Sequence, residues 1–141
     1  MNEESLTVHT DGGARGNPGP AACAFTLESK GKIFEKKSRF LGSSTNNFAE
    51  YQAIIFAIKS IVNTPGLLTK ETSIVFYSDS ELVVRQLGGL YRIKNETLKK
   101  LSLEIRDLIS DNNLNIIFKH IPRNQNKIAD YLVNKELDLR V

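Results

Sequence analysis

The chain has 141 residues, of which 40% are hydrophobic, so it can form one ordinary domain with a single core. Its net charge of +3 is compatible with a polyanionic partner but does not require one. A lone cysteine, Cys23, excludes an intrachain disulfide, and no apolar run of about 18 residues could span a membrane. Residues 1–5 lack a signal-peptide pattern, so we expect a cytoplasmic protein with no membrane partner.

The first predicted element is a strand that leads into a glycine-rich turn. Residues alternate in character from Leu6 to Asp11, as in a pleated strand, and Gly12 and Gly13 are expected to stop it. Asp11 would then stand at the strand end, beside bare backbone that can approach a phosphate. A plain Asp-Gly hairpin turn is the alternative interpretation. The spacing of nucleotide-binding glycine loops is missing.

Two further strands are predicted over residues 21–27 and 33–41, which would complete a three-strand meander. The last of these strands is rich in basic residues. These residues form either an exposed sheet edge that its lysines keep soluble or part of a surface that binds along a nucleic-acid backbone. The basic residues are Lys30, Lys32, Lys36, Lys37 and Arg39.

A helix is predicted over residues 48–62, after a cluster of capping residues at 43–47. Glu50 shares the apolar face of this helix with Ala53 and Ile54. Glu50 is therefore either a first-turn glutamate that caps the helix or interacts favourably with its dipole, or an inward carboxylate that needs a cation or a hydrogen-bond donor.

The apolar run at residues 73–78 is typical of a strand buried on both faces. Asp79 follows it, at the strand end where open α/β sheets place ligand sites. The alternative is that Asp79 or Ser80 only caps the helix predicted over residues 81–87.

After a turn at residues 88–91, the sequence predicts a helix, a strand and a final helix. Their ranges are 95–110, 114–121 and a segment that runs through Ile128, Ala129, Leu132, Val133 and Leu137. Asp130 falls in the second turn of the final helix, and by itself it would be an ordinary surface acid.

These elements predict one α/β domain over residues 1–141, with helices packed on a mixed sheet. Four acids fall at element ends, and such carboxylates would repel one another if they clustered without divalent cations. Ligation by oxygen alone indicates Mg²⁺ or Mn²⁺ rather than zinc. The four acids are Asp11, Glu50, Asp79 and Asp130.

The chain resembles the type 1 ribonuclease H family at four motifs spread over nearly its whole length. The motifs lie at residues 10–20, 45–51, 77–80 and 126–130. The resemblance implies a ribonuclease H-like fold, with a five-stranded mixed sheet flanked by helices. Three strands would form the antiparallel meander and two would be parallel.

The resemblance also implies an endoribonuclease that cuts the RNA strand of RNA/DNA hybrids and leaves 5′-phosphate and 3′-hydroxyl ends. Two Mg²⁺ or Mn²⁺ ions would be bound by the four acids, with Asp11 bridging them and Asp130 holding the hydrolytic ion. Two such ions can activate water and stabilise the leaving oxygen. Contacts to 2′-hydroxyls would select the RNA strand. The resemblance assigns hybrid contacts to Gly12, Gly13, Ala14, Asn17, Asn47, Glu50 and Ser80.

The chain departs from the family pattern in two places. Many members carry a mobile histidine in the loop after the last strand, whereas His120 falls within the predicted strand here. The His-Ile-Pro-Arg sequence resembles a branch that uses an arginine instead, so Arg123 is the first candidate to assist catalysis and His120 the second. An ordinary half-buried strand histidine is the alternative for His120.

The second departure is the missing basic, tryptophan-rich protrusion, because the chain has no Trp and only a short link at residues 88–92. Hybrid binding would be weaker or would depend on Arg92, Lys94, Lys99 and Lys100. We expect a monomer that needs no protein partner. The other hypotheses are a binding module without catalysis, a different metal nuclease of the same superfamily, and a purely structural protein.

Overall fold

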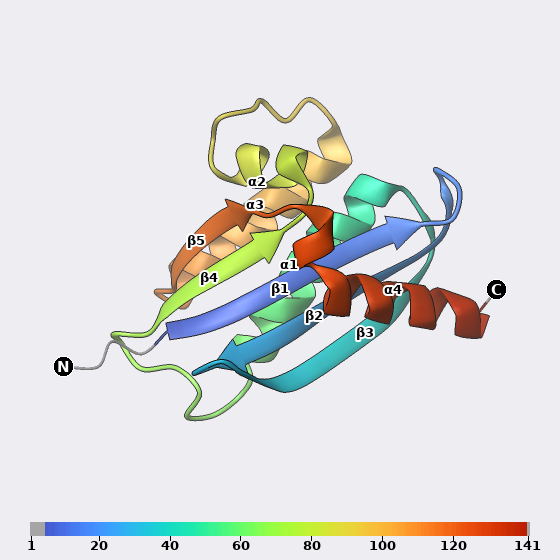
Figure 1. The fold of residues 1–141 in the computed structure, drawn as a ribbon. Coiled ribbons are helices and arrows are strands. Elements are labelled where there is room, and N and C mark those ends of the chain that lie inside the picture. Colours follow the sequence, from blue (N-terminus) through green and yellow to red (C-terminus); the bar gives the residue numbers. More distant parts are fainter. Residues whose placement is uncertain (1–4, 141) are drawn as a thin grey trace.

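A five-stranded mixed sheet forms the centre of the protein, with the strand order β3-β2-β1-β4-β5 (Figure 1). The computed structural model describes residues 5–140, so most of the segment 1–5, which lacks a signal-peptide pattern, lies outside the described part of the chain. The first three strands form an antiparallel meander, while β4 runs parallel to β1 and β5 parallel to β4. This arrangement confirms the predicted fold class. The strands are β1 (Ser5–Ala14), β2 (Gly19–Ser29), β3 (Lys32–Ser44), β4 (Ser73–Ser78) and β5 (Asn115–His120).

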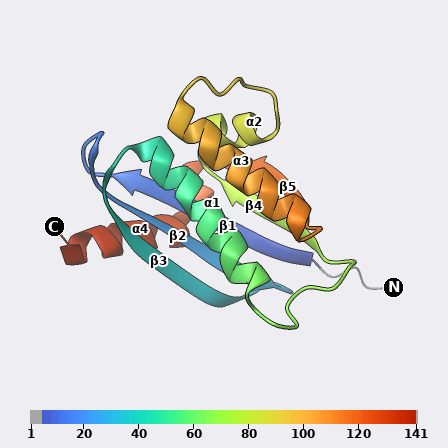
Figure 2. The same ribbon diagram turned by 180° about the vertical axis from the view of Figure 1, so that it is seen from behind.

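Helices cover both faces of the sheet, but unequally. Figure 2 shows α1 and α3 side by side on one face, whereas α4 crosses the other face over the meander in Figure 1. None of the helices within residues 5–140 combines the length and the apolar character that crossing a bilayer requires. The helices are α1 (Asn46–Val62), α2 (Glu81–Leu87), α3 (Glu96–Asp111) and α4 (Lys127–Arg140), and a short 3-10 turn at Arg123–Gln125 precedes α4.

Two apolar clusters hold these layers together. The larger one lies between the sheet, α1 and α3, and includes Phe25, Ile54 and Phe76. The smaller one lies under α4 and consists of Ala22, Ala24, Val133 and Leu137. Burial of apolar side chains is the main stabilising contribution to a fold. Because the larger cluster lies on the α1 face, most of this stabilisation comes from that face.

Polar side chains cap the starts of three helices. Thr45 accepts a hydrogen bond from the Phe48 amide at the start of α1, and Asn95 does the same at α3. Ser80, rather than Asp79, caps α2 by accepting from the Val83 amide. These caps satisfy backbone N–H groups that have no partner within a helix.

The prediction that Gly12 and Gly13 end the first strand is wrong. β1 continues to Ala14, and Gly12 and Gly13 pair with Cys23 and Ala22 of β2. Neither glycine has a positive φ. Gly12 is instead required by close packing, because a Cβ there would collide with the Ala49 backbone of α1.

The predicted burial of β4 on both faces is also wrong. Ile74, Phe76 and Ser78 are buried, but Val75 and Tyr77 are only half-buried. The cause is that α4 packs on β1, β2 and β3, so it leaves the outer face of β4 partly open.

Four smaller predictions about the helices and the last strand need correction. α1 begins two residues earlier than predicted, and β5 is shorter by one residue at each end. In α4, Asp130 lies in the first turn rather than the second. Ile128, predicted to belong to the apolar face, is 43% exposed because it points away from the small cluster beneath this helix.

Candidate active site

The fold brings the four predicted acids into one cleft of about 430 Å³. Asp11 comes directly after the point where the parallel pairing of β1 with β4 ends, and Asp79 directly follows β4. Glu50 reaches the same point from α1, so that carboxylate oxygens of Asp11, Glu50 and Asp79 lie within 4.8 Å of one another. Asp130 enters the cleft from α4.

Glu50 is held inward by two hydrogen bonds. Its Oε1 accepts from the Gly12 backbone N–H at 3.0 Å, and its Oε2 accepts from the Ser78 hydroxyl at 3.4 Å. Because α1 begins at Asn46, Glu50 lies in the second turn, and the first turn contains no acidic residue. The structure therefore favours the inward carboxylate over the capping glutamate.

Burial and mutual repulsion raise the pKa values of the inner acids. Burial raises the pKa of Asp11 to about 7, and the charges of Asp79 and Asp130 add to this increase. Burial also raises the pKa of Glu50 well above its ordinary range, and the neighbouring Asp11 adds to this effect. A divalent cation would offset this concentrated negative charge, and the purely carboxylate donor set of this cluster fits a hard ion such as Mg²⁺ or Mn²⁺.

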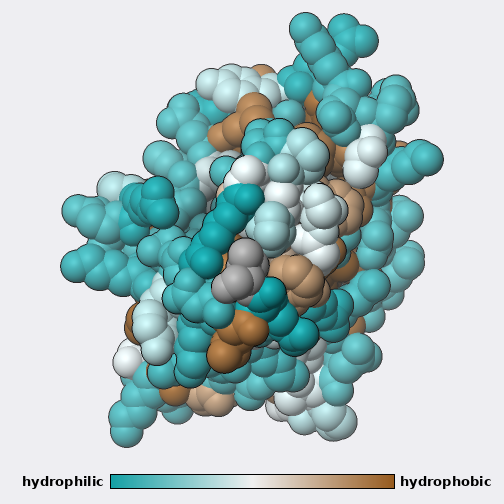
Figure 3. All heavy atoms as spheres, turned by 90° about the vertical axis from the view of Figure 1, so that its right-hand side faces the viewer, coloured by the Kyte–Doolittle hydropathy of each residue, from teal (hydrophilic) through white to brown (hydrophobic). Residues whose placement is uncertain are grey.

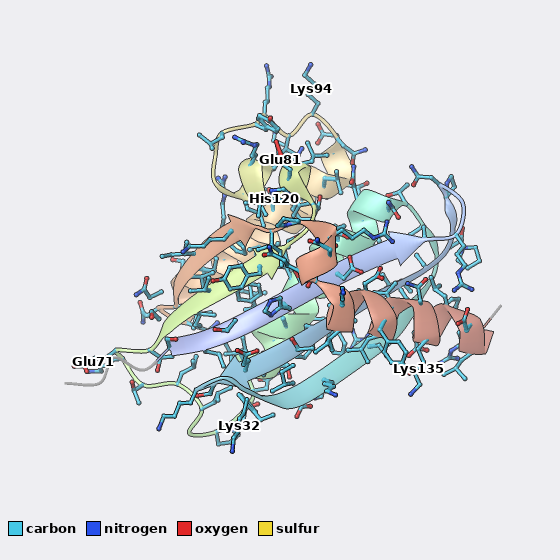
Figure 4. All side chains as sticks on the ribbon, in the orientation of Figure 1. Lys32, Glu71, Glu81, Lys94, His120 and Lys135 are labelled. Atoms are coloured by element: carbon cyan, nitrogen blue, oxygen red, sulfur yellow. The ribbon has the colours of Figure 1, made fainter. Side chains whose placement is uncertain are left out.

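Arg123 and His120, the two residues predicted to assist catalysis, lie in different surroundings. Nη2 of Arg123 lies 3.3 Å from Oδ1 of Asp130, and Arg123 lines the acidic cleft. His120 is exposed at the last position of β5, as Figure 4 shows, and is not among the residues that line this cleft. The strand position predicted for His120 is thus observed. A catalytic role for either residue stays a prediction.

Several groups predicted to contact a hybrid already have partners within the chain. Besides the Gly12 amide, the Ala14 amide donates to Oδ1 of Asn46 at 2.8 Å, and the Asn46 amide donates to Oδ1 of Asn17 at 2.9 Å. These bonds tie the glycine-rich end of β1 to the start of α1. Asn17 and Asn47 line a second groove beside the start of α1, and Gly13 lines the acidic cleft.

Three residues whose side chains donate hydrogen bonds to the acids were not predicted as site residues. They are Asn126, Asn134 and Ser78. The Nδ2 group of Asn134 donates to the carbonyl and to Oδ1 of Asp130. Its position four residues after Asp130, on the same helix face, is the signal that could have identified it.

The chain is similar to known proteins in its sequence and in its fold. Residues 9–136 match the protein family described as Reverse transcriptase-like. The chain is 35% identical over 136 residues to the Bifunctional protein Rv2228c of Mycobacterium tuberculosis, covering 94% of this chain and 35% of the relative. The chain thus spans about a third of the length of the mycobacterial relatives it matches.

Other similar proteins match the chain over nearly their full length. The Ribonuclease H of Lachnoclostridium phytofermentans is 31% identical, with 94% of this chain and 92% of the relative covered. The structure of LC11-RNase H1 in complex with an RNA/DNA hybrid has a TM-score of 0.90 and 38% identity, and covers 95% of this chain and 97% of that chain. By its sequence and its fold, the chain belongs to the type 1 ribonuclease H family.

Proposed function

We propose that this protein is an endoribonuclease that hydrolyses the RNA strand of RNA/DNA hybrids and leaves 5′-phosphate and 3′-hydroxyl ends. The observation that carries the proposal is the convergence of Asp11, Glu50, Asp79 and Asp130 on one cleft in a chain of this family. The similarity to LC11-RNase H1, whose structure contains such a hybrid, supports the choice of substrate. The activity would reside in one domain over residues 1–141.

The four acids would hold two divalent ions, Mg²⁺ or Mn²⁺. When bound, the ions supply the positive charge that activates the attacking water and stabilises the leaving 3′-oxygen. The chain contributes by fixing its carboxylates beforehand. The Gly12 amide and the Ser78 hydroxyl hold Glu50 toward Asp11, so little rearrangement is needed when the ions bind.

We propose that the hybrid lies across the cleft, where Gly12, Gly13 and Ala14 contact it, and across the neighbouring groove, where Asn17 and Asn47 do. Ser80, which follows Asp79, would contact it as well. Four exposed basic residues on and after the α2–α3 link would bind its phosphates, without reading sequence. They are Arg92, Lys94, Lys99 and Lys100, and Figure 4 shows Lys94 projecting away from the sheet.

We also propose that the protein acts as a monomer and needs no protein partner. The face that carries the end of α4 is mainly hydrophilic, with small separate hydrophobic areas among its described residues (Figure 3). Stable interfaces between subunits usually have a broader apolar centre.

The test is cleavage of a labelled RNA/DNA hybrid in Mg²⁺ or Mn²⁺, beside double-stranded RNA and double-stranded DNA. Wild type, Asp79→Asn and the surface control Asp107→Asn are compared, because Asp107 is exposed on α3. We expect internal cuts in the RNA strand, reduced at least about 100-fold by Asp79→Asn and unchanged by Asp107→Asn.

Two other results would point to the competing hypotheses. Binding of the hybrid without cleavage in either metal would indicate a binding module. Cleavage of DNA alone would indicate a different nuclease of the same superfamily.

A further inference from the structure

Asn126 is a buried amide at the junction of three elements that carry the acids. Its side chain is 1% exposed, and it directly precedes α4. Its Nδ2 group donates to the Thr10 carbonyl at 2.8 Å and to Oδ2 of Asp79 at 3.4 Å. Its own backbone carbonyl accepts from the Asp130 amide at 3.1 Å. One residue therefore connects Asp79 with the residue before Asp11 and with the first turn that carries Asp130.

The two ends of the Asn126 amide differ in their hydrogen bonding. Its Oδ1 is buried without a hydrogen-bond partner among the described residues, although both contacts of Nδ2 are made. Buried polar atoms are normally paired, because leaving them unpaired weakens the fold. The side chain thus acts as a donor, and its donor group points at Asp79.

Gln86 provides a contrast within the same molecule. It is also a buried amide, but its Oε1 accepts from the Tyr51 hydroxyl at 2.7 Å. Gln86 is not among the residues that line the acidic cleft. Replacing it removes a buried amide without touching the four acids.

We infer that Asn126 is a positioning residue, which sets the orientation of Asp79 relative to Asp11 and Asp130 and thereby the affinity of the cleft for divalent cations. This inference rests on the proposed function. A donor to one oxygen of a ligating carboxylate fixes its orientation before the ion arrives, and loss of such a partner typically weakens metal binding 10–100-fold. A carboxylate free to rotate would have to be ordered by the ion itself.

The experiment compares Asn126→Leu with Gln86→Leu in the full chain. Leucine has the branched shape of asparagine and one side-chain heavy atom fewer than glutamine, and it has no polar side-chain atoms. Calorimetric titration with Mn²⁺ alone measures metal affinity, and urea unfolding in a chelator measures stability. Asn126→Ala gives the same information if the leucine at this position is not tolerated.

We expect Asn126→Leu to bind Mn²⁺ at least about tenfold more weakly than wild type, and its hybrid cleavage to recover partly as the metal concentration is raised. Gln86→Leu should lose stability but bind Mn²⁺ as wild type does. Equal Mn²⁺ affinity in wild type and both Asn126 variants would overturn the inference while leaving the proposed function intact. A wild-type protein that bound no Mn²⁺ would overturn the metal centre itself, and the inference with it.

Discussion

The two faces of the sheet are built for different purposes. On the α1 face, large buried side chains such as Phe25, Ile54 and Phe76 fill the space between the sheet and two helices. On the α4 face, the buried cluster consists only of two alanines, Val133 and Leu137, and the acidic cleft lies beside it.

This difference separates stability from function. The α1 face supplies most of the apolar burial and fixes the strands that carry Asp11 and Asp79. The cleft works against folding, because it concentrates carboxylates whose pKa values are raised by burial and by one another. Such a site persists because the rest of the fold can hold it in place.

The largest effect is expected where the two faces meet, at Gly12. Its missing Cβ lets α1 pack against β1, and its amide holds Glu50. Gly12→Ala should cost about 5 kcal/mol or more of unfolding free energy and abolish cleavage, because the obstacle is the Ala49 backbone rather than a flexible side chain. Urea unfolding and hybrid cleavage measure both effects.

Gly13→Ala is the matched control for this prediction. A Cβ at Gly13 would meet Val133 Cγ1 at 3.6 Å, an ordinary contact. We therefore expect a well-folded variant. If Gly12→Ala were as stable as Gly13→Ala, the close packing of α1 on β1 would not constrain the site.

The second prediction separates the two faces directly. Phe76→Ala, on the α1 face, should destabilise the protein by about 3–5 kcal/mol, whereas Val133→Ala, on the buried side of α4, should cost only about 1–2 kcal/mol. Activity per folded molecule should show the opposite order, because Val133 packs α4, which carries Asp130, against the sheet. Denaturant titrations and cleavage assays corrected for the folded fraction test both statements. Greater loss of corrected activity in Phe76→Ala would contradict the separation.

The third prediction concerns pH in the absence of metal. The pKa of Asp11 is about 7 in the folded protein and 3.8 ordinarily, so between these values the folded state keeps a proton that the unfolded chain has lost. Stability should therefore fall as pH rises from about 4 to just above 7, by roughly 4 kcal/mol in total from this group. Urea unfolding in a chelator at pH 5 and pH 8 measures the decrease.

Asp11→Asn isolates the contribution of this carboxylate, since the other titrating groups remain. The variant should show a flatter pH profile and be more stable than wild type at pH 8. Parallel profiles for the two proteins would mean that the charge of Asp11 does not oppose folding. Mg²⁺ should stabilise wild type at pH 8 and should stabilise the variant less.

Much of the fold could be predicted from local sequence patterns. What these patterns missed depends on contacts between residues far apart in the chain. The meander and β4 followed from alternation and apolar runs, Asp11 and Asp79 from their positions at strand ends, and Glu50 from its place on an apolar helix face. Asp130 by itself looked like a surface acid, and only the set of four acids and the family resemblance singled it out. The apolar run of β4 could not reveal that α4 leaves one of its faces partly open, because coverage depends on where a distant helix crosses.

The supporting hydrogen bonds of the site were harder to predict for a similar reason. Asn126 and Thr10 are 116 residues apart, and the Gly12 amide meets Glu50 across 38 residues. No periodicity within a strand or helix encodes such contacts. The ribonuclease H motifs include all four residues, but motif membership alone does not distinguish an amide that holds a carboxylate from one that contacts substrate.

The smallest effect is expected at the edge of the cleft. Arg123 and His120 are the two candidates there for a residue that assists catalysis. Arg123 lies 3.3 Å from Asp130 but its side chain is 78% exposed, so solvent weakens the ion pair and its contribution to stability is small. We expect Arg123→Ala to lower kcat about tenfold, or roughly 1.4 kcal/mol of barrier, because the guanidinium lines the cleft beside Asp130. His120→Ala should change kcat less than about twofold, since this residue ends β5 outside the set that lines the cleft. Steady-state kinetics on the hybrid with both variants decides which of the two residues assists catalysis.

A larger loss of kcat in His120→Ala would assign this role to the histidine. It would also require the loop after β5 to move toward the acids when the hybrid binds.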